Sequence, residues 1–130
     1  MTTTQVLLYA ALLLIVLVYA RRFFLTRSIT RYSAIQLADR LKDGGAVLLD
    51  VRTASEVHTG SIKGAVYIPV QELARREDEL KKYADKEIIC YCQTGSRSLL
   101  AAARLKKQGF RASHLEGGIA EWNFAQRQKG

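Results

Sequence analysis

The sequence predicts an α/β fold in which a parallel β-sheet is covered by helices on both faces and is preceded by one transmembrane helix. Short apolar runs typical of buried strands alternate with capped segments typical of helices over most of the chain. Residues Thr2 to Ala20, in contrast, carry no charge. With 130 residues, the chain is long enough for one domain with an appendage but too short for two ordinary domains.

The N-terminal segment is expected to be an uncleaved membrane anchor. A helix over residues 2–20 would be about 28 Å long, close to the ~30 Å of a hydrocarbon core. No Lys or Arg precedes Val6, whereas arginines stand at positions 21, 22, 27 and 31. This asymmetry predicts a single-pass protein with its C-terminal side in the cytoplasm. A cleaved signal peptide ending at Ala20 and a buried structural helix are the alternatives.

Three segments divide the chain: an anchor over 1–22, a connector over 23–30 and a folded domain over 31–130. The domain begins with a helix capped by Ser33, which runs to about Lys42 and stops at the glycines that follow it. A buried strand over 46–51, a turn with a short helix over 53–60 and a strand over 66–68 come next.

The rest of the domain continues the alternation. Residues 71–83 are predicted to form a charged surface helix in which Leu73 and Leu80 face inward. The apolar run that begins at Ile88 is a strand, and a helix over 98–108 ends at Gly109. A strand over 112–115 and a turn at Gly117 and Gly118 come next. A last helix carries Phe124 and Trp122, and the Trp122 side chain is expected in the core.

The segment from Cys92 to Ser98, called the Cys92 loop below, carries the strongest functional signal. Its thiol stands where a buried strand passes into a helix, so free amide hydrogens and the positive end of the helix dipole surround it. A dipole contribution of up to ~2 kcal/mol would lower a thiol pKa by about 1.5 units, which favours a thiolate nucleophile. Gly95 can adopt the positive φ that turns amides inward, and Arg97 adds a positive charge. Further donors are expected from the hydroxyls of Thr94 and Ser96.

The Cys92 loop resembles the active-site loop of the rhodanese family of sulfurtransferases, which reads Cys, two variable residues, Gly, one variable residue, Arg and Ser. Other motifs of that family follow in the same order from near Ile29 to Trp122. They are an Asp-Val-Arg strand end (Asp50, Val51, Arg52), a Glu (Glu56), a Gly-x-Ile-x-Gly-Ala turn (Gly60 to Ala65), an Ile-Pro pair (Ile68, Pro69) and a Gly-Gly-x-x-x-Trp element (Gly117, Gly118, Trp122). Two positions depart from the family pattern: Ser61 stands where many members have His, and Tyr67 where many have Asn.

This resemblance implies a rhodanese-like domain with a central parallel sheet of about five strands. It also implies a sulfurtransferase that moves sulfane sulfur from thiosulfate or a related persulfide donor to cyanide or a thiol, through a persulfide on Cys92. The implied substrate-binding residues are Gln93, Thr94, Gly95, Ser96, Arg97 and Ser98, and the supporting residues are Asp50, Arg52 and Glu56. The expected partners are the small-molecule sulfur donor, a thiol acceptor of thioredoxin or glutathione type, and the membrane through residues 2–20.

No cofactor, metal or nucleic acid is expected. The net charge of +8 is partly accounted for by the four arginines at positions 21, 22, 27 and 31, and the later basic pairs are interrupted by Glu77, Asp78 and Glu79. Two cysteines without a histidine at ligand spacing make a poor metal site.

Two other functions stay open. A phosphatase or arsenate reductase would use a similar cysteine and arginine, but such loops place five residues between them, whereas four separate Cys92 from Arg97 here. A docking module without activity would generally lack the nucleophile.

Several single residues also have two interpretations. Arg97 either attracts the donor or braces the loop against Asp50 or Glu56, and Cys90 is either a packing residue or a resolving thiol. Asp50 and Arg52 are structural hydrogen-bonding groups or steer the substrate. His58 and His114 are expected to be an exposed turn residue and a strand-end residue rather than catalysts.

Overall fold

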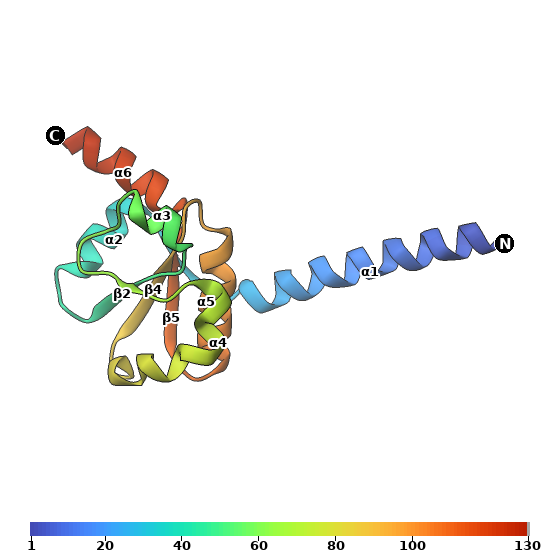
Figure 1. The fold of residues 1–130 in the computed structure, drawn as a ribbon, viewed down its shortest axis with the longest axis horizontal. Helices are drawn as coiled ribbons and strands as arrows, with labels where there is room; N and C mark the ends of the chain where they lie inside the picture. The colour runs from blue at the N-terminus through green and yellow to red at the C-terminus, as the bar shows by residue number, and fades with distance from the viewer. Residues whose placement is uncertain (130) are drawn as a thin grey trace.

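A five-stranded sheet in the order β1-β5-β4-β2-β3 forms the centre of the domain in the computed structural model, which describes residues 1–129 (Figure 1). Its strands are β1 (Thr30–Tyr32), β2 (Ala46–Asp50), β3 (Val66–Tyr67), β4 (Glu87–Tyr91) and β5 (Arg111–Leu115). All four pairings are parallel, so the predicted parallel sheet of about five strands is confirmed.

Helices and helical turns precede, connect and follow these strands. They are α1 (Thr3–Thr26), α2 (Ala34–Leu41), α3 (Ala54–His58), η1 (Val70–Glu72), α4 (Leu73–Arg76), η2 (Glu77–Tyr83), α5 (Ser96–Lys107) and α6 (Gly118–Lys129). Ser33 caps α2 as predicted, and Thr53 caps α3, each in a reciprocal capping box.

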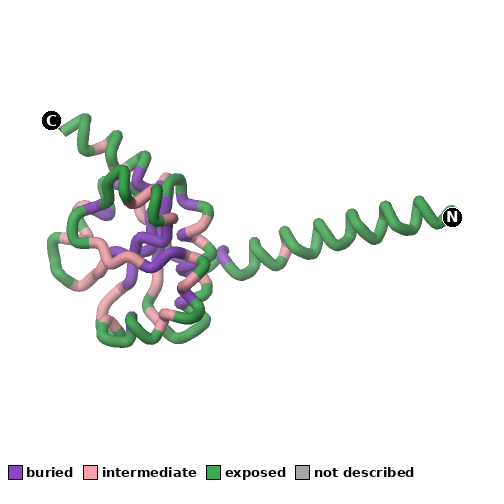
Figure 2. The backbone as a smooth tube through the Cα atoms, viewed as in Figure 1, coloured by how far each residue is buried: buried purple, intermediate pink, exposed green. Residues whose placement is uncertain are grey.

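Both faces of the sheet are covered by packed apolar side chains, because alternate strand residues point to opposite faces. One face packs on α5 and α4, and its cluster includes Leu49, Ile88, Cys90, Ala102 and Leu105. The other face packs on α2 and α6, and its cluster includes Leu37, Leu48, Ile89, Leu115 and Ile119. Figure 2 shows the buried backbone concentrated in the central strands.

Three elements differ from the sequence prediction. The segment 71–83 is not one helix but two 3₁₀ segments around a single α-helical turn, although Leu73 and Leu80 are buried as expected. Strand β1 was not predicted, because Thr30 and Arg31 are exposed and give no alternating pattern. Helix α5 begins at Ser96, two residues before the predicted start.

The aromatic side chains of the last helix, α6, are less buried than the sequence predicts. Trp122 was expected in the core but is only partly buried, at the edge of the second cluster. Phe124 is 56 % exposed.

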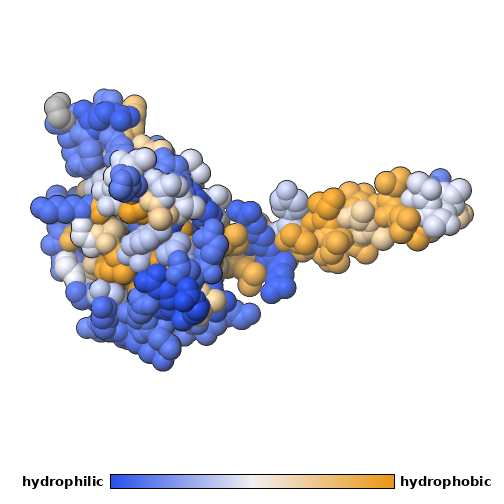
Figure 3. All heavy atoms as spheres, in the orientation of Figure 1, coloured by the Kyte–Doolittle hydropathy of each residue, from blue (hydrophilic) through white to orange (hydrophobic). Residues whose placement is uncertain are grey.

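Helix α1 projects from the domain as a long apolar rod (Figure 3). By length and composition, it is the one helix within the described residues that could cross a membrane, and its apolar residues are exposed. The predicted connector is helical as far as Thr26, which is buried against the domain. At this junction, Leu25 lines a groove with Leu100 and Ala103 of α5, and Lys106 donates to the carbonyl of Ser28.

Candidate active site

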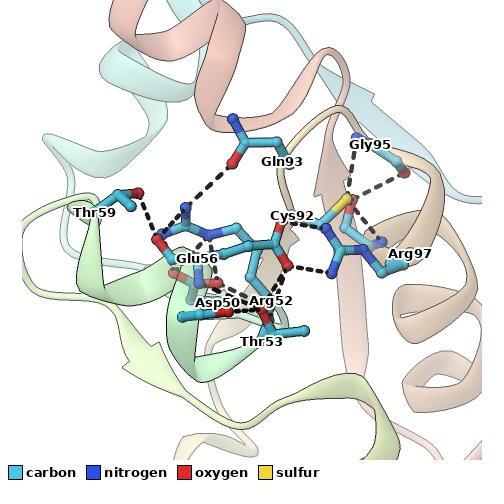
Figure 4. Close-up of polar contacts among 11 residues, drawn as sticks. Asp50, Arg52, Thr53, Glu56, Thr59, Cys92, Gln93, Gly95 and Arg97 are labelled. Carbon is cyan, nitrogen blue, oxygen red and sulfur yellow. Dashed lines mark hydrogen bonds and ion pairs between the residues drawn. The ribbon is translucent and has the colours of Figure 1, made fainter.

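Cys92 directly follows β4 at the carboxyl edge of the sheet, and its sulfur lies against the first turn of α5. The amide of Gly95 lies 3.0 Å from Sγ (Figure 4). The amide of Ser98 lies 3.4 Å from the same sulfur. Gly95 is the N-cap residue of α5 and has a φ of 114°. It has no side chain that could accept a hydrogen bond from the amides of the first turn. The cysteine sulfur therefore takes the place that a Ser or Asp oxygen occupies at other helix starts.

These contacts favour the thiolate form of Cys92, which is only 1 % exposed. Burial raises the pKa of this thiol, but hydrogen bonds from Ser98, Gly95 and Thr94 outweigh burial and lower the pKa below its ordinary value. Cys90 shows the opposite result, since burial raises the pKa of its thiol and no hydrogen bond compensates. Cys90 lies in the apolar cluster between the sheet and α5, as the packing interpretation predicted.

Arg52 braces the Cys92 loop from the neighbouring strand. Its side chain is 1 % exposed and forms a bidentate pair with Asp50, at 3.0 Å and 2.8 Å. The same guanidinium donates to the carbonyls of Glu56 and Gly60 and to Oε1 of Gln93 at 3.3 Å. Its donors are thus occupied by the protein, which agrees with the structural interpretation of Asp50 and Arg52.

Arg97 and Glu56 close the outer side of the loop. The two N–H groups of Arg97 donate to the two oxygens of Glu56 at 2.6 Å and 2.7 Å. The Arg97 guanidinium, with smaller contributions from Thr53, lowers the pKa of Glu56 to about 2 against the effect of burial. Of the two roles considered for Arg97, this geometry favours the brace and selects Glu56 rather than Asp50 as its partner.

The start of α6 holds the loop from a second side. The amides of Ile119 and Ala120 donate to the carbonyls of Cys92 and Gln93, at 3.0 Å and 3.2 Å. Gly118 permits this approach, because a Cβ at that position would lie 2.6 Å from the Cys92 carbonyl oxygen. The Gly-Gly element was predicted only as a turn, and its role as a support for the loop comes from the structure.

The structure also brings one residue to the site that the sequence did not assign to it. His114 on β5 is 3 % exposed, and its Nδ1 lies 3.1 Å from Oγ of Ser98, which in turn lies 3.6 Å from the sulfur. The position of His114 near a strand end was predicted correctly. No pattern in the sequence, however, shows that the His114 ring contacts Ser98. His58, in contrast, is exposed at the end of α3.

The remaining loop residues face outward. Gln93, Thr94 and Ser96 are exposed. Within residues 1–129, the sulfur accepts hydrogen bonds from the main-chain amides of Gly95 and Ser98, and as a thiol it donates to Oγ of Ser98. A polar pocket of about 210 Å³ lies beside the loop, and Arg52, Ser61, Gln93 and Asn123 contribute to its walls.

The site thus consists of a buried cysteine held by amides at a strand-to-helix turn, with an arginine five positions later. The family model of the rhodanese-like domain matches the sequence over residues 33–125, which is most of the chain. The chain belongs to the rhodanese-like domain family. The predicted fold class of this rhodanese-like protein is therefore confirmed.

Its relatives include a sulfurtransferase and tRNA uridine(34) hydroxylases. A sulfurtransferase of Allochromatium vinosum is 40% identical over 88 residues, covering 66% of this chain and 80% of that protein. A tRNA uridine(34) hydroxylase of Salmonella arizonae is 33% identical over 102 residues, which make up 75% of this chain but 29% of the hydroxylase. Among solved structures, the thiosulfate sulfurtransferase of Pseudomonas aeruginosa matches with a TM-score of 0.68 at 28% identity, over 77% of this chain and 20% of that one. The rhodanese-like chain thus resembles one part of these two longer proteins and most of the A. vinosum protein.

Proposed function

We propose that the protein is a sulfurtransferase that carries sulfane sulfur as a persulfide on Cys92. The observation that carries this proposal is the pair of amide hydrogens, from Gly95 and Ser98, directed at the cysteine sulfur. Such a cradle stabilises a thiolate before the reaction and a persulfide anion after it. The sulfurtransferase relative at 40% identity supports the same reaction class.

In the first step, the Cys92 thiolate attacks the outer sulfur of a donor such as thiosulfate. A new S–S bond forms, the donor's own sulfur–sulfur bond breaks, and sulfite leaves with the bonding electron pair. In the second step, cyanide or a thiolate attacks the terminal sulfur, forming thiocyanate or a new persulfide and regenerating the Cys92 thiolate. The atoms and electrons balance without an external oxidant.

The burial of Cys92 bears on which donors it accepts. Because the residue is only 1 % exposed, the proposed donors present their sulfur at the end of a narrow group, as thiosulfate and a persulfide chain do. Arg97 is held by Glu56, so its proposed part is to fix the loop and add a positive charge near the sulfur. A thiol of thioredoxin or glutathione type is the proposed cellular acceptor.

We further propose that residues 1–22 anchor the protein in a membrane with the domain in the cytoplasm. The exposed apolar surface of α1 and the arginines that follow residue 20 support this arrangement.

The test compares matched cysteine variants of the full chain in detergent micelles. After treatment with thiosulfate, intact-mass measurement should show one added sulfur atom in the wild type and in Cys90→Ala, but none in Cys92→Ser. Cyanide should then remove that sulfur as thiocyanate. A wild-type protein that gains no sulfur from thiosulfate or from a glutathione persulfide would contradict the proposal. The inactive docking module would then be the remaining interpretation. Hydrolysis of p-nitrophenyl phosphate, assayed in parallel, would instead indicate a phosphatase.

A further inference from the structure

His114 makes one side-chain hydrogen bond while buried beside the candidate active site. Its Nδ1 lies 3.1 Å from Oγ of Ser98, and its Nε2 has no hydrogen-bond partner among residues 1–129. The ring lies on β5, next to β4, whose end positions Cys92. The hydrogen bond to Ser98 spans 16 residues of sequence, so it joins two separate elements at the sulfur.

The position of the ring proton follows from these contacts. Burial, and then the charge of Arg31, lower the pKa of His114 to about 4 against the opposing effect of Glu116, so the ring is neutral near pH 7. A proton on Nε2 would be a buried donor without an acceptor, whereas a proton on Nδ1 leaves only an unpaired acceptor. Unpaired donors are the less tolerated of the two. Nδ1 therefore carries the hydrogen and donates it to Ser98.

This tautomer determines what the Ser98 hydroxyl can do. Its oxygen accepts from His114 and from the Cys92 thiol at 3.6 Å, and its hydrogen is donated to the Gly95 carbonyl at 3.0 Å. When the thiol loses its proton, the hydroxyl hydrogen can rotate from Gly95 to the sulfur. With the other tautomer, the hydroxyl would donate to His114 instead and the thiolate would lose a donor.

We propose that His114 is a positioning residue that acts through Ser98, reserving the Ser98 hydroxyl as a hydrogen-bond donor to the ionised sulfur of Cys92. This inference rests on the proposed role of Cys92, but its tests measure a ring proton and a thiol ionisation rather than sulfur transfer. A failed sulfur-transfer assay and a failed His114 test are therefore distinguishable.

The first experiment uses the unaltered full chain in detergent micelles. With ¹⁵N-labelled histidine, the ring-nitrogen chemical shifts identify the protonated nitrogen, and a His58→Gln variant assigns the two histidines. We expect the Nδ1–H form of His114 from pH 6 to 8. An Nε2–H form, or a charged ring across that range, overturns the proposal.

The second experiment measures the ionisation of Cys92 from the pH dependence of its alkylation, in a Cys90→Ala background. His114→Phe keeps an aromatic ring but removes the N–H group that donates to Ser98. The pKa of Cys92 should therefore rise by about one unit. His114→Asn places an N–H donor near the position of Nδ1, and the wild-type pKa should be retained. Arg97, whose charge acts on Cys92, and Arg31 and Glu116, whose charges act on His114, are unchanged in both variants.

A double-variant comparison separates positioning from general packing. Ser98→Ala should raise the Cys92 pKa by itself, and adding His114→Phe to it should cause no further rise. A wild-type pKa in His114→Phe, or equal rises in the Phe and Asn variants, overturns the proposal. If His114→Phe does not fold, the tautomer measurement decides.

Discussion

Cys90 and Cys92 stand two residues apart, yet their surroundings move their pKa values in opposite directions. Both side chains are buried in the same apolar cluster, so burial alone would make both thiols inert. The difference is the set of amides directed at Cys92, which the geometry of Gly95 and the first turn of α5 provides. A few hydrogen bonds thus distinguish a reactive thiol from a packing residue.

Selective alkylation should reveal this contrast. In the folded full chain at pH 7, we expect iodoacetamide to modify Cys92→Ser at least tenfold more slowly than Cys90→Ala. The thiolate is the reactive form, so the Cys90→Ala rate should rise with pH and level off below about 8.5, the pKa of an ordinary thiol. Similar rates in the two variants, or no plateau below that pH, would contradict the assignment.

Much of the site at the residue scale could be predicted from the sequence, because its components are close together in the chain. Cys92, Gly95 and Ser98 belong to one loop, and their spacing is sufficient to predict an anion-binding turn. The partners from other strands were less predictable. Glu56 and Asp50 remained alternatives for Arg97, and His114 received no role because its contact with Ser98 depends on the register of β5.

At the scale of elements, the start of α6 determines where the Cys92 loop lies. Two amides of α6 hold the carbonyls of Cys92 and Gln93, and the close approach requires a residue without a Cβ at position 118. The φ of Gly118 is also positive, at 63°. Gly44 has a similar φ of 74°, but a Cβ added there would meet no other group within 4 Å.

Alanine substitutions at these two glycines should therefore differ. Gly44→Ala should lower the free energy of unfolding by about 1 kcal/mol, because only backbone strain is added. Gly118→Ala adds a steric conflict and should cost at least about 2 kcal/mol more. Thermal unfolding of the full chain measures both values, and persulfide formation should fall in Gly118→Ala alone. Equal losses at the two positions would show that α6 does not hold the loop.

The elements that the sequence did not predict have a common physical cause. Strand β1 is an edge strand of three residues, so it buries too little to show a period of two. The segment 71–83 winds partly as 3₁₀ turns, although its inward leucines match the helical prediction. Long elements with one buried face were predictable, whereas short elements defined by their neighbours were not.

At the scale of the whole molecule, α1 and the Cys92 loop lie at different ends of α5. The junction with α1 involves Leu25, Ser28 and Lys106, while the Cys92 loop forms the first turn of α5 at the other end of this helix. The twelve residues of α5 span about 18 Å. Figure 1 shows α1 extending away from the domain. With α1 in a bilayer, we expect the reactive cysteine to stay accessible to water-soluble donors.

Protease protection tests the orientation of the anchor. In right-side-out vesicles, the domain should be protected from added protease, and in inverted vesicles it should be digested, because the arginines at 21, 22, 27 and 31 favour the cytoplasmic side. Replacing these arginines with glutamine should weaken this preference. Digestion of the wild-type domain in sealed right-side-out vesicles would place it on the opposite side of the membrane.

The use of a cysteine sulfur as the N-terminal cap of α5 has a consequence for how the protein responds to its cargo. A persulfide would carry its negative charge on a second sulfur, about 2 Å beyond the one that the amides of Gly95 and Ser98 now hold. The thiolate and persulfide forms of the protein would then differ in how stable the first turn of α5 is, as well as in their chemistry. Amide hydrogen exchange in the opening turn of α5 should accordingly report, without any acceptor present, whether the carrier is occupied.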